Sequence, residues 1–282
     1  MNITTSKNVI GAQIRDVDLA QPLSAAEFGR IEDAFNAHAV VSFPQQHLDE
    51  EQLVAFARRF GEVERIFLKH YAHPRHPEIM YVSNIKENGR DIGHADAGSV
   101  WHTDMSYTAQ PPRATLLYAL EVPMENGVAL GDTHFSSAAA AYDSLPAQTQ
   151  RRIAHLRAIH QVAGRRARTG TGQADQALRR EQPAVVHPVV RTHPFTGRKC
   201  LYVSKGECEG IEGMATDEAL ALIEELADTI VEARFHHTHH WQVHDVLMWD
   251  NCTVQHLASF DYKWPQHRRL MHRVTVGGRA PV

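Results

Sequence analysis

Trp101-His102-Thr103-Asp104 is the stretch that decides the fold and chemistry of this 282-residue chain. Far downstream it is followed by Trp249-Asp250-Asn251 and then by His256. Residues two apart on a β-strand face the same side, so we expect His102 and Asp104 to reach one metal ion from a single short strand. A distant histidine would complete a set of two imidazoles and one carboxylate. Such a set leaves coordination positions open on one side of the ion and is typical of non-haem Fe(II).

The composition indicates one globular unit that acts on a small molecule. A chain of 282 residues is long for a domain, but units with a β core often reach this size, so we expect a single domain over residues 1–282. The net charge of −4, from 29 Lys+Arg against 33 Asp+Glu, provides no overall field to attract nucleic acid or an anionic membrane. We therefore expect a small-molecule substrate, with no nucleic acid and no membrane as partner; assembly into a homo-oligomer stays open.

The cysteines and the first residues predict a cytoplasmic protein. Cys200, Cys208 and Cys252 are too few and odd in number for a disulfide framework, and none forms a Cys-x-x-Cys pair. The chain begins without the apolar segment of a secretion signal, and it contains no run of about 18 apolar residues that could span a membrane.

Hydrophobic periodicity predicts a mixture of helices and strands. Helical spacing of apolar residues appears in the ranges 24–38, 49–60, 136–145, 146–156 and 217–233. Short β-rich runs predict strands at 39–44, 79–82, 114–121, 185–190, 199–204, 246–249 and 271–277. Residues 164–182 are rich in arginine and glycine and poor in apolar side chains, which favours a mobile insert or lid over a site.

Because the chain has 20 histidines, most of them cannot be metal ligands. The tract His236-His237-Thr238-His239-His240 is more prominent than His102, but clustered histidines beside a strand are commonly solvated. We therefore interpret this tract as solvent-exposed and not as a metal site. A lone His-x-Asp is also common by chance, so the ligand assignment depends on the motifs around it.

Four motifs follow one another in a fixed order along the chain. They are Trp101 to Tyr107 followed by Pro111-Pro112, Gly131 to Phe135, Trp249 to His256, and Arg268 to Thr275. In this order they resemble the TauD/TfdA family of Fe(II)- and 2-oxoglutarate-dependent dioxygenases. The resemblance implies a mixed α/β fold with a mainly β core, a double-stranded β-helix (jelly roll) with flanking helices. It also implies oxidation, most simply hydroxylation, of a small and anionic organic substrate with release of succinate and CO2.

The resemblance assigns roles to individual residues. It makes His102, Asp104 and His256 the ligands of Fe(II), with 2-oxoglutarate and O2 as co-substrates. It places Thr133 and Arg269 on the distal carboxylate of 2-oxoglutarate, where a planar guanidinium and a hydroxyl can both donate hydrogen bonds.

Substrate contacts are expected from three further regions. By resemblance Arg273 lies near the acidic group of the substrate or of 2-oxoglutarate, whereas the odd spacing of Arg268 turns it toward solvent. By resemblance the segment 64–71 forms one wall of the pocket, where Lys69, His70 and Tyr71 could meet an anionic substrate, and Asn84 stands at a strand end. The stretch 87–100 departs from the pattern of the taurine enzyme, so the resemblance does not imply taurine as the substrate.

Two other functions fit parts of the pattern. A zinc hydrolase could use the same three ligands with a metal-bound water, but it would not need Thr133, Arg269 and Arg273. A non-catalytic jelly-roll binding protein could keep the ligands by descent, but it would have no use for the metal ligands and the arginine pair together. Hydroxylation, desaturation and related outcomes of the same chemistry stay open at this point.

Overall fold

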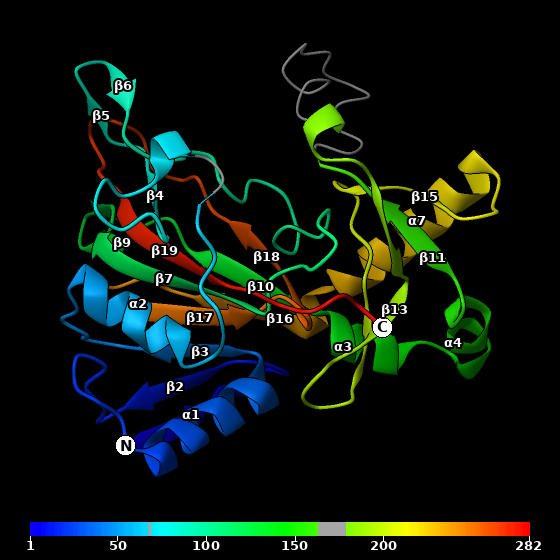
Figure 1. Ribbon diagram of the computed structural model, residues 1–282, viewed down its shortest axis with the longest axis horizontal. Coiled ribbons are helices and arrows are strands. Elements are labelled where there is room, and N and C mark those ends of the chain that lie inside the picture. Colours follow the sequence, from blue (N-terminus) through cyan, green and yellow to red (C-terminus); the bar gives the residue numbers. More distant parts are fainter. Residues whose placement is uncertain (67–68, 163–178) are drawn as a thin grey trace.

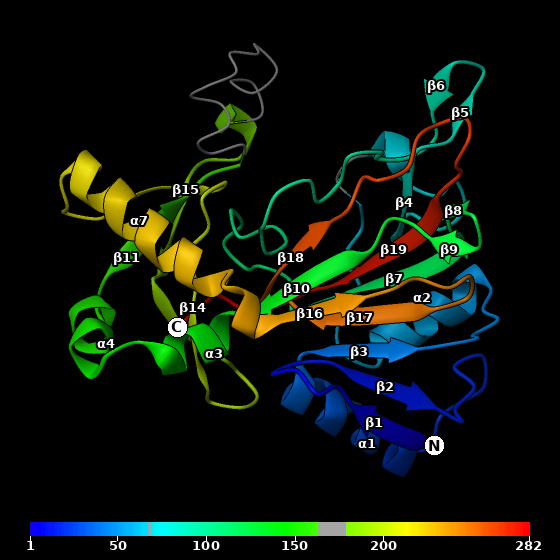
Figure 2. The ribbon, with the colours of Figure 1, turned by 180° about the vertical axis from the view of Figure 1, so that it is seen from behind.

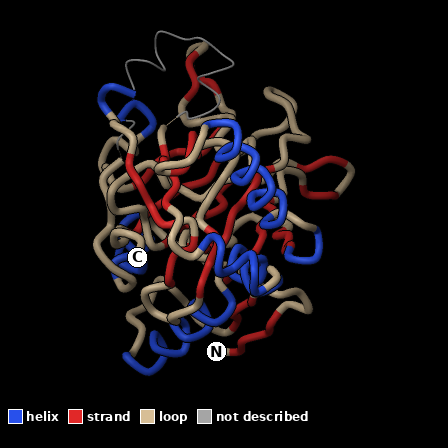
Figure 3. Tube along the Cα trace, turned by 90° about the vertical axis from the view of Figure 1, so that its right-hand side faces the viewer, coloured by secondary structure: helices blue, strands red, loops and turns tan. Residues whose placement is uncertain are grey.

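The computed structural model describes residues 1–66, 69–162 and 179–282. A large sheet and a small sheet face each other, two helices cover the outer face of the large sheet, and a smaller group of helices and strands lies beside them (Figure 1). Seen from the side, helices lie in front of the strands and at the lower edge of the molecule (Figure 3). No helix of the described chain is both long and apolar enough to cross a membrane.

The large sheet has seven strands in the order β1-β2-β3-β17-β7-β19-β4. Its pairs are antiparallel except for β2 and β3, which run in parallel. The strands are β1 (Asn2–Thr5), β2 (Ala12–Arg15), β3 (Val40–Phe43), β17 (Val246–Asp250), β7 (Ala114–Glu121), β19 (Leu270–Val276) and β4 (Ile79–Ser83). The β-rich runs in the sequence predicted the four central strands β3, β17, β7 and β19. The run at 79–82 predicted β4.

The small sheet carries residues of the predicted site. Its order is β16 (His236–His239), β10 (Thr133–Ser137) and β18 (Val254–Ala258), all antiparallel. The register places Phe135 opposite His256 and Thr133 opposite Ala258. Because side chains alternate across a strand, Thr133, Phe135 and His256 all face the large sheet.

The same alternation divides each strand of the large sheet between two cores. Leu117, Leu247 and Met271 point toward the small sheet and form one core with Phe135. Their neighbours in sequence point to the other face and pack under α1 (Ala25–His38) and α2 (Glu50–Arg58). On β7 and β19 the residues that point toward the small sheet also include polar side chains, and these extend to the predicted site.

Both predicted N-terminal helices are confirmed, with the starts that their capping residues indicated. Ser24 and Asp49 each accept a hydrogen bond from the backbone N–H three residues on, and Glu27 and Gln52 complete the two capping boxes. Phe35 of α1 and Phe56 of α2 are buried in the core between these helices and the large sheet.

A third core forms beside the sandwich. It contains α3 (Ala138–Ser144), α4 (Ala147–Ile153) and α7 (Thr216–Ile230), with β11 (Arg157–His160), β12 (Val185–Pro188), β13 (Val190–Thr192), β14 (Lys199–Leu201) and β15 (Cys208–Ile211) (Figure 2). The remaining short elements are η1 (Lys69–Tyr71), β5 (Lys86–Glu87), β6 (Arg90–Asp91), β8 (Met124–Glu125), β9 (Val128–Ala129) and η2 (Ala233–Phe235). Most of the predicted insert at 164–182 lies outside the described residues.

The mixed fold with a mainly β core is as predicted, but two local expectations were wrong. His102 and Asp104 do not share a strand: His102 makes only an isolated bridge to His256, and the chain turns at Asp104, with a positive φ of 49° at Met105. The histidine tract is solvated only in part, because β16 pairs with β10 and leaves His239 only 8% exposed, whereas the side chain of His240 is 77% exposed. Hydrogen bonds to distant partners determine both conformations, and local patterns do not reveal such partners.

Candidate active site

Two imidazoles and one carboxylate converge at the open end of the sandwich, between the two sheets. The Nε2 atoms of His102 and His256 lie 3.7 and 3.9 Å from Oδ1 of Asp104, and the ligand atoms of all three residues lie within 4.8 Å of one another. The backbones of His102 and His256 exchange hydrogen bonds of 3.2 and 2.8 Å, which brings the loop before Asp104 to β18. Two nitrogen donors and one oxygen donor around a common point can hold a divalent transition metal.

The hydrogen bonding of His102 and the protonation of His256 and Asp104 suit metal ligands. Nδ1 of His102 lies 2.8 Å from the carbonyl of Val100, which can only accept, so Nδ1 carries the proton and Nε2 is free to bind a metal. Burial and the neighbouring His102 hold the pKa of His256 well below its ordinary value and keep that imidazole neutral. Burial opposes ionisation of Asp104, but Arg273 and the two imidazoles outweigh it and hold the pKa of this carboxyl well below its usual range.

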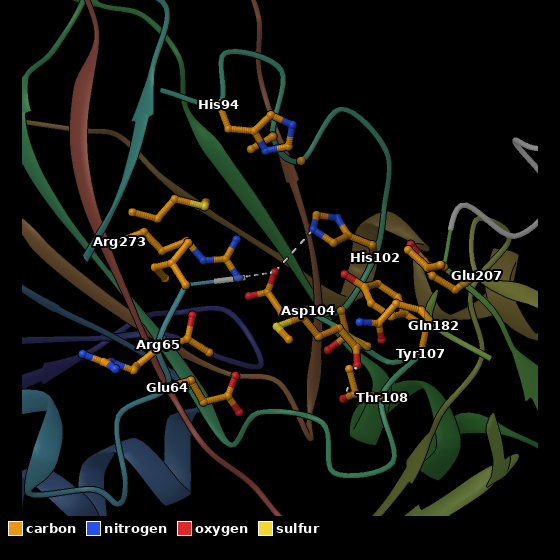
Figure 4. Close-up of a pocket in the computed structure, with 18 residues that line it drawn as sticks. Glu64, Arg65, His94, His102, Asp104, Tyr107, Thr108, Gln182, Glu207 and Arg273 are labelled. Carbon is orange, nitrogen blue, oxygen red and sulfur yellow. Dashed lines mark hydrogen bonds and ion pairs between the residues drawn. The ribbon is translucent and has the colours of Figure 1, made fainter. Parts of the chain in front are cut away.

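Both oxygens of Asp104 have partners from the large sheet. Arg273 of β19 donates to Oδ1 at 2.9 Å, and the hydroxyl of Thr115 on β7 donates to Oδ2 at 2.6 Å. Figure 4 shows Arg273 pointing toward Asp104, while the guanidinium of Arg65 points away from it. His102, Asp104 and His256 are called the metal group from here on. Arg273 is therefore the cationic side chain directed at the metal group.

A cavity of about 330 Å³ opens beside these residues (Figure 4). Its apolar wall comes from Ile66, Met80, Ala97, Met105 and Val162, and its polar wall from Glu64, Arg65, His94, Tyr107, Thr108, Gln182, Glu207, Arg273 and Thr275. Burial raises the pKa of Tyr107 to about 12, so its phenol remains a neutral hydrogen-bond donor. The cavity is large enough for a small organic molecule whose reacting carbon would lie next to the metal group.

A second, smaller cavity of about 40 Å³ lies on the other side of His102 and Arg273, which line both cavities. Thr133 and Arg269 are on its wall. Arg269 is 3% exposed, its Nε has no hydrogen-bond partner, and no carboxylate pairs with it among the described residues. By contrast, the exposed Arg268 binds both oxygens of Glu121, as its predicted outward orientation allows. A buried cation without a counter-ion is costly, so this cavity is suited to an anionic ligand.

The hydroxyl of Thr133 is oriented for the same ligand. The indole N–H of Trp241 donates to Thr133 Oγ1 at 3.0 Å. Indole nitrogen can only donate, so the hydroxyl accepts this bond and keeps its own proton for a further acceptor. Thr133 and Arg269 can therefore donate to one carboxylate together.

The residues expected at the substrate have other contacts. Asn84 Oδ1 accepts from the backbone N–H of Arg269 at 2.9 Å, and its amide donates to the carbonyl of His267. Asn84 thus fixes the backbone before β19 and is not among the described lining of either cavity. His70 and Tyr71 are also not among the described residues of this lining, although the Tyr71 ring stacks on His94, which does line the large cavity.

Sequence reasoning missed several residues of the site, among them His94, Tyr107, Thr115 and Trp241, whereas Glu64, Arg65 and Ile66 of the expected wall segment do line the large cavity. Thr115 carried a signal, since it is a polar residue in a strand that is otherwise apolar and buried at its start. A buried hydroxyl requires a hydrogen-bond partner. The others lie in loops or beside motifs whose spacing carries no sign of their contacts.

Comparison with known proteins identifies the chain. The profile described as "Taurine catabolism dioxygenase TauD, TfdA family" matches residues 2–275. The chain belongs to this family. It is 33% identical over 279 residues to the alpha-ketoglutarate-dependent 2,4-dichlorophenoxyacetate dioxygenase of Burkholderia sp. (strain RASC), covering 95% of this chain and 92% of that one. It is 29% identical to the alpha-ketoglutarate-dependent sulfate ester dioxygenase of Pseudomonas putida, with 97% and 88% covered.

A solved structure supports the same assignment. The crystal structure of AAD-2 in complex with Mn(II) and N-oxalylglycine superposes with a TM-score of 0.85 at 28% identity, covering 99% of this chain and 98% of the other. This TauD/TfdA member is thus a jelly-roll, Fe(II)- and 2-oxoglutarate-dependent dioxygenase, as the sequence resemblance implied. The family assignment favours this function over a zinc hydrolase or a non-catalytic binding protein.

The converging side chains generate a prediction about the metal. His256→Ala should abolish the visible absorbance that appears when Fe(II) and 2-oxoglutarate are added without oxygen, because a ligand of the ion is lost. The matched control is His240→Ala, which removes an imidazole that is 77% exposed and paired with Asp132. If the His240 variant lost the absorbance and the His256 variant kept it, the metal would lie elsewhere.

The unpaired arginine generates a prediction about the co-substrate. Arg269→Ala should weaken 2-oxoglutarate binding by about 2–4 kcal/mol, because a buried charged contact has no substitute. Thr133→Val should cost less, and Arg268→Ala should leave the affinity unchanged because that side chain is exposed and bound to Glu121. Calorimetric titration of the Mn(II)-loaded protein measures all three, and an unchanged affinity in Arg269→Ala would reject the assignment.

Proposed function

We propose that this dioxygenase hydroxylates a small organic substrate that carries one acidic group. In this proposal His102, Asp104 and His256 hold Fe(II), and Arg269 with Thr133 holds the far carboxylate of 2-oxoglutarate. The observation that carries it is the pair of cavities that meet at His102 and Arg273, one small with the buried guanidinium of Arg269, whose Nε has no hydrogen-bond partner, and one large with a mixed wall.

The division of the site separates the roles of its residues. Bound Fe(II), with 2-oxoglutarate and O2, supplies the oxidising chemistry and yields succinate and CO2. Arg269 and Thr133 orient the co-substrate from the small cavity by a charged and a neutral hydrogen bond. The apolar wall formed by Ile66, Met80 and Met105 positions the substrate and excludes water from the reacting carbon.

The polar wall supports a substrate with a single acidic group. Arg273 faces both cavities, and Tyr107 adds a neutral donor on the same side as Asp104. Glu64 and Glu207 are also on the wall, and their carboxylates disfavour a second anionic group nearby. Two relatives are named for 2,4-dichlorophenoxyacetate and for a sulfate ester, which supports an acidic organic substrate here.

A substrate screen tests this proposal. Aryloxy acids, alkyl sulfates and small sulfonates should accelerate succinate release in the Fe(II)-loaded enzyme, and their neutral amide or ester analogues should accelerate it less. Compounds with two acidic groups should be poorer than their mono-acid counterparts. Product analysis by mass spectrometry should show addition of one oxygen atom. A neutral compound that outperforms every acid would reject the anionic substrate, and a product that has lost two hydrogens would reject hydroxylation.

A further inference from the structure

A hydrogen-bonded chain of buried side chains runs from Trp249 to the metal group. The indole Nε1 of Trp249 donates to Asn251 Oδ1 at 3.1 Å, and Asn251 Nδ2 donates to Thr115 Oγ1 at 3.0 Å. The Thr115 hydroxyl then donates to Asp104 Oδ2 at 2.6 Å. The four side chains come from β17, the turn after it, β7 and the loop that follows His102, and all are at most 3% exposed.

Each side chain in this hydrogen-bonded series can take only one arrangement of donor and acceptor roles. Indole can only donate, so the Asn251 atom that faces it is the carbonyl oxygen, which also receives the backbone N–H of Asp104 at 3.4 Å. The NH2 of Asn251 must then face Thr115, and it too can only donate. The Thr115 hydroxyl therefore accepts from Asn251 and gives its single proton to Asp104. The donor-only indole of Trp249 therefore sets the direction of every hydrogen bond in the series, and the last of these bonds is donated to the carboxylate of Asp104.

As a result, the two oxygens of Asp104 have different partners. Oδ2 receives the Thr115 proton, whereas Oδ1 faces the Nε2 atoms of His102 and His256 and accepts from Arg273 at 2.9 Å. A carboxylate whose Oδ2 is bound to Thr115 in this way presents Oδ1 to a metal, and Oδ1 can bind the ion beside its contact with Arg273 because a carboxylate oxygen has two lone pairs. Ligation through one oxygen leaves the positions on the open side of the ion available to the co-substrates.

We propose that Trp249, Asn251 and Thr115 are positioning residues that hold Asp104 as a one-oxygen ligand. The inference rests on the proposed assignment of Asp104 as a metal ligand. Thr115 and Asn251 are not among the described residues that line the two cavities and act through Asp104, whereas Trp249 also lines the small cavity and packs against His256.

The local structure fixes this chain of residues rigidly. Thr115 lies opposite Trp249 on one neighbouring strand and opposite Thr275 on the other, so its hydroxyl side is set by the register of three strands. The backbone of Asn251 donates to the carbonyl of Arg113 at 3.0 Å and accepts from the Thr103 hydroxyl at 2.8 Å. The turn that holds Asn251 also leads into β18, which carries His256. Valine would fill the space of Thr115 in this strand, but it has no proton for Asp104.

The test compares Thr115→Val with Thr115→Ser. Loss of the hydroxyl at nearly constant volume should weaken binding of Mn(II), measured by calorimetry, about 10–100-fold, as is typical when a partner of a metal ligand is removed. Serine should restore most of the affinity because it keeps the donor. Trp249→Phe should weaken binding less, and adding it to Thr115→Val should have little further effect, since the chain is already broken.

Ser136→Ala is the matched control for loss of a buried hydroxyl. Ser136 is fully buried on β10 and donates to the carbonyl of Ile230, away from the metal group. Its loss should lower the thermal unfolding temperature while leaving Mn(II) affinity unchanged. If both variants lost affinity only in proportion to their loss of stability, the role of Thr115 would be packing and the proposal would be overturned.

The two levels of the argument fail differently. Lost metal binding in His256→Ala with wild-type binding in Thr115→Val would overturn the positioning chain alone. Wild-type metal binding in His256→Ala would overturn the ligand assignment and the positioning chain with it.

Discussion

A buried carboxylate is the constraint on which the rest of this structure depends. Asp104 is 3% exposed, and its charge is stable there only because Arg273, Thr115 and two imidazoles surround it. Those partners come from β19, β7, β18 and the loop at 102, so satisfying one side chain requires both sheets to be in register. Fold and site are thereby coupled through one charged group.

The alternation of side chains across strands separates stability from chemistry in this sandwich. Every second residue of β7 and β19 packs under α1 and α2, whereas the intervening residues face the small sheet. Thr115, Arg273 and Thr275 belong to the inward set, so the polar residues of the site are placed by the same pattern that builds the core. Two indoles, of Trp241 and Trp249, add fixed donors that determine which way the nearby hydroxyls and amide point.

The sequence predicted the class of fold and the set of residues that meet at the metal group. It predicted the local geometry of those residues less successfully. Ordered motifs were sufficient to bring His102, Asp104 and His256 into one hypothesis, and odd spacing correctly turned Arg268 outward. The strand expected at 102–104 is absent because the loop is fixed by Asn251 and Thr115, partners that lie far away in the sequence. Asn84 was expected at the substrate, but its amide binds backbone, a contact that residue type alone does not predict. The pairing and register of the strands determine the side-chain contacts that the motifs did not predict.

The central claim is that Fe(II) is held by His102, Asp104 and His256, with 2-oxoglutarate between the metal and Arg269. A crystal structure of the protein with Mn(II) and N-oxalylglycine tests it most directly. The account predicts one ion bound by Nε2 of both histidines and by Oδ1 of Asp104 alone, with the far carboxylate of N-oxalylglycine on Arg269 and Thr133. An ion at other residues, ligation by both oxygens of Asp104, or a ligand carboxylate away from Arg269 would contradict it.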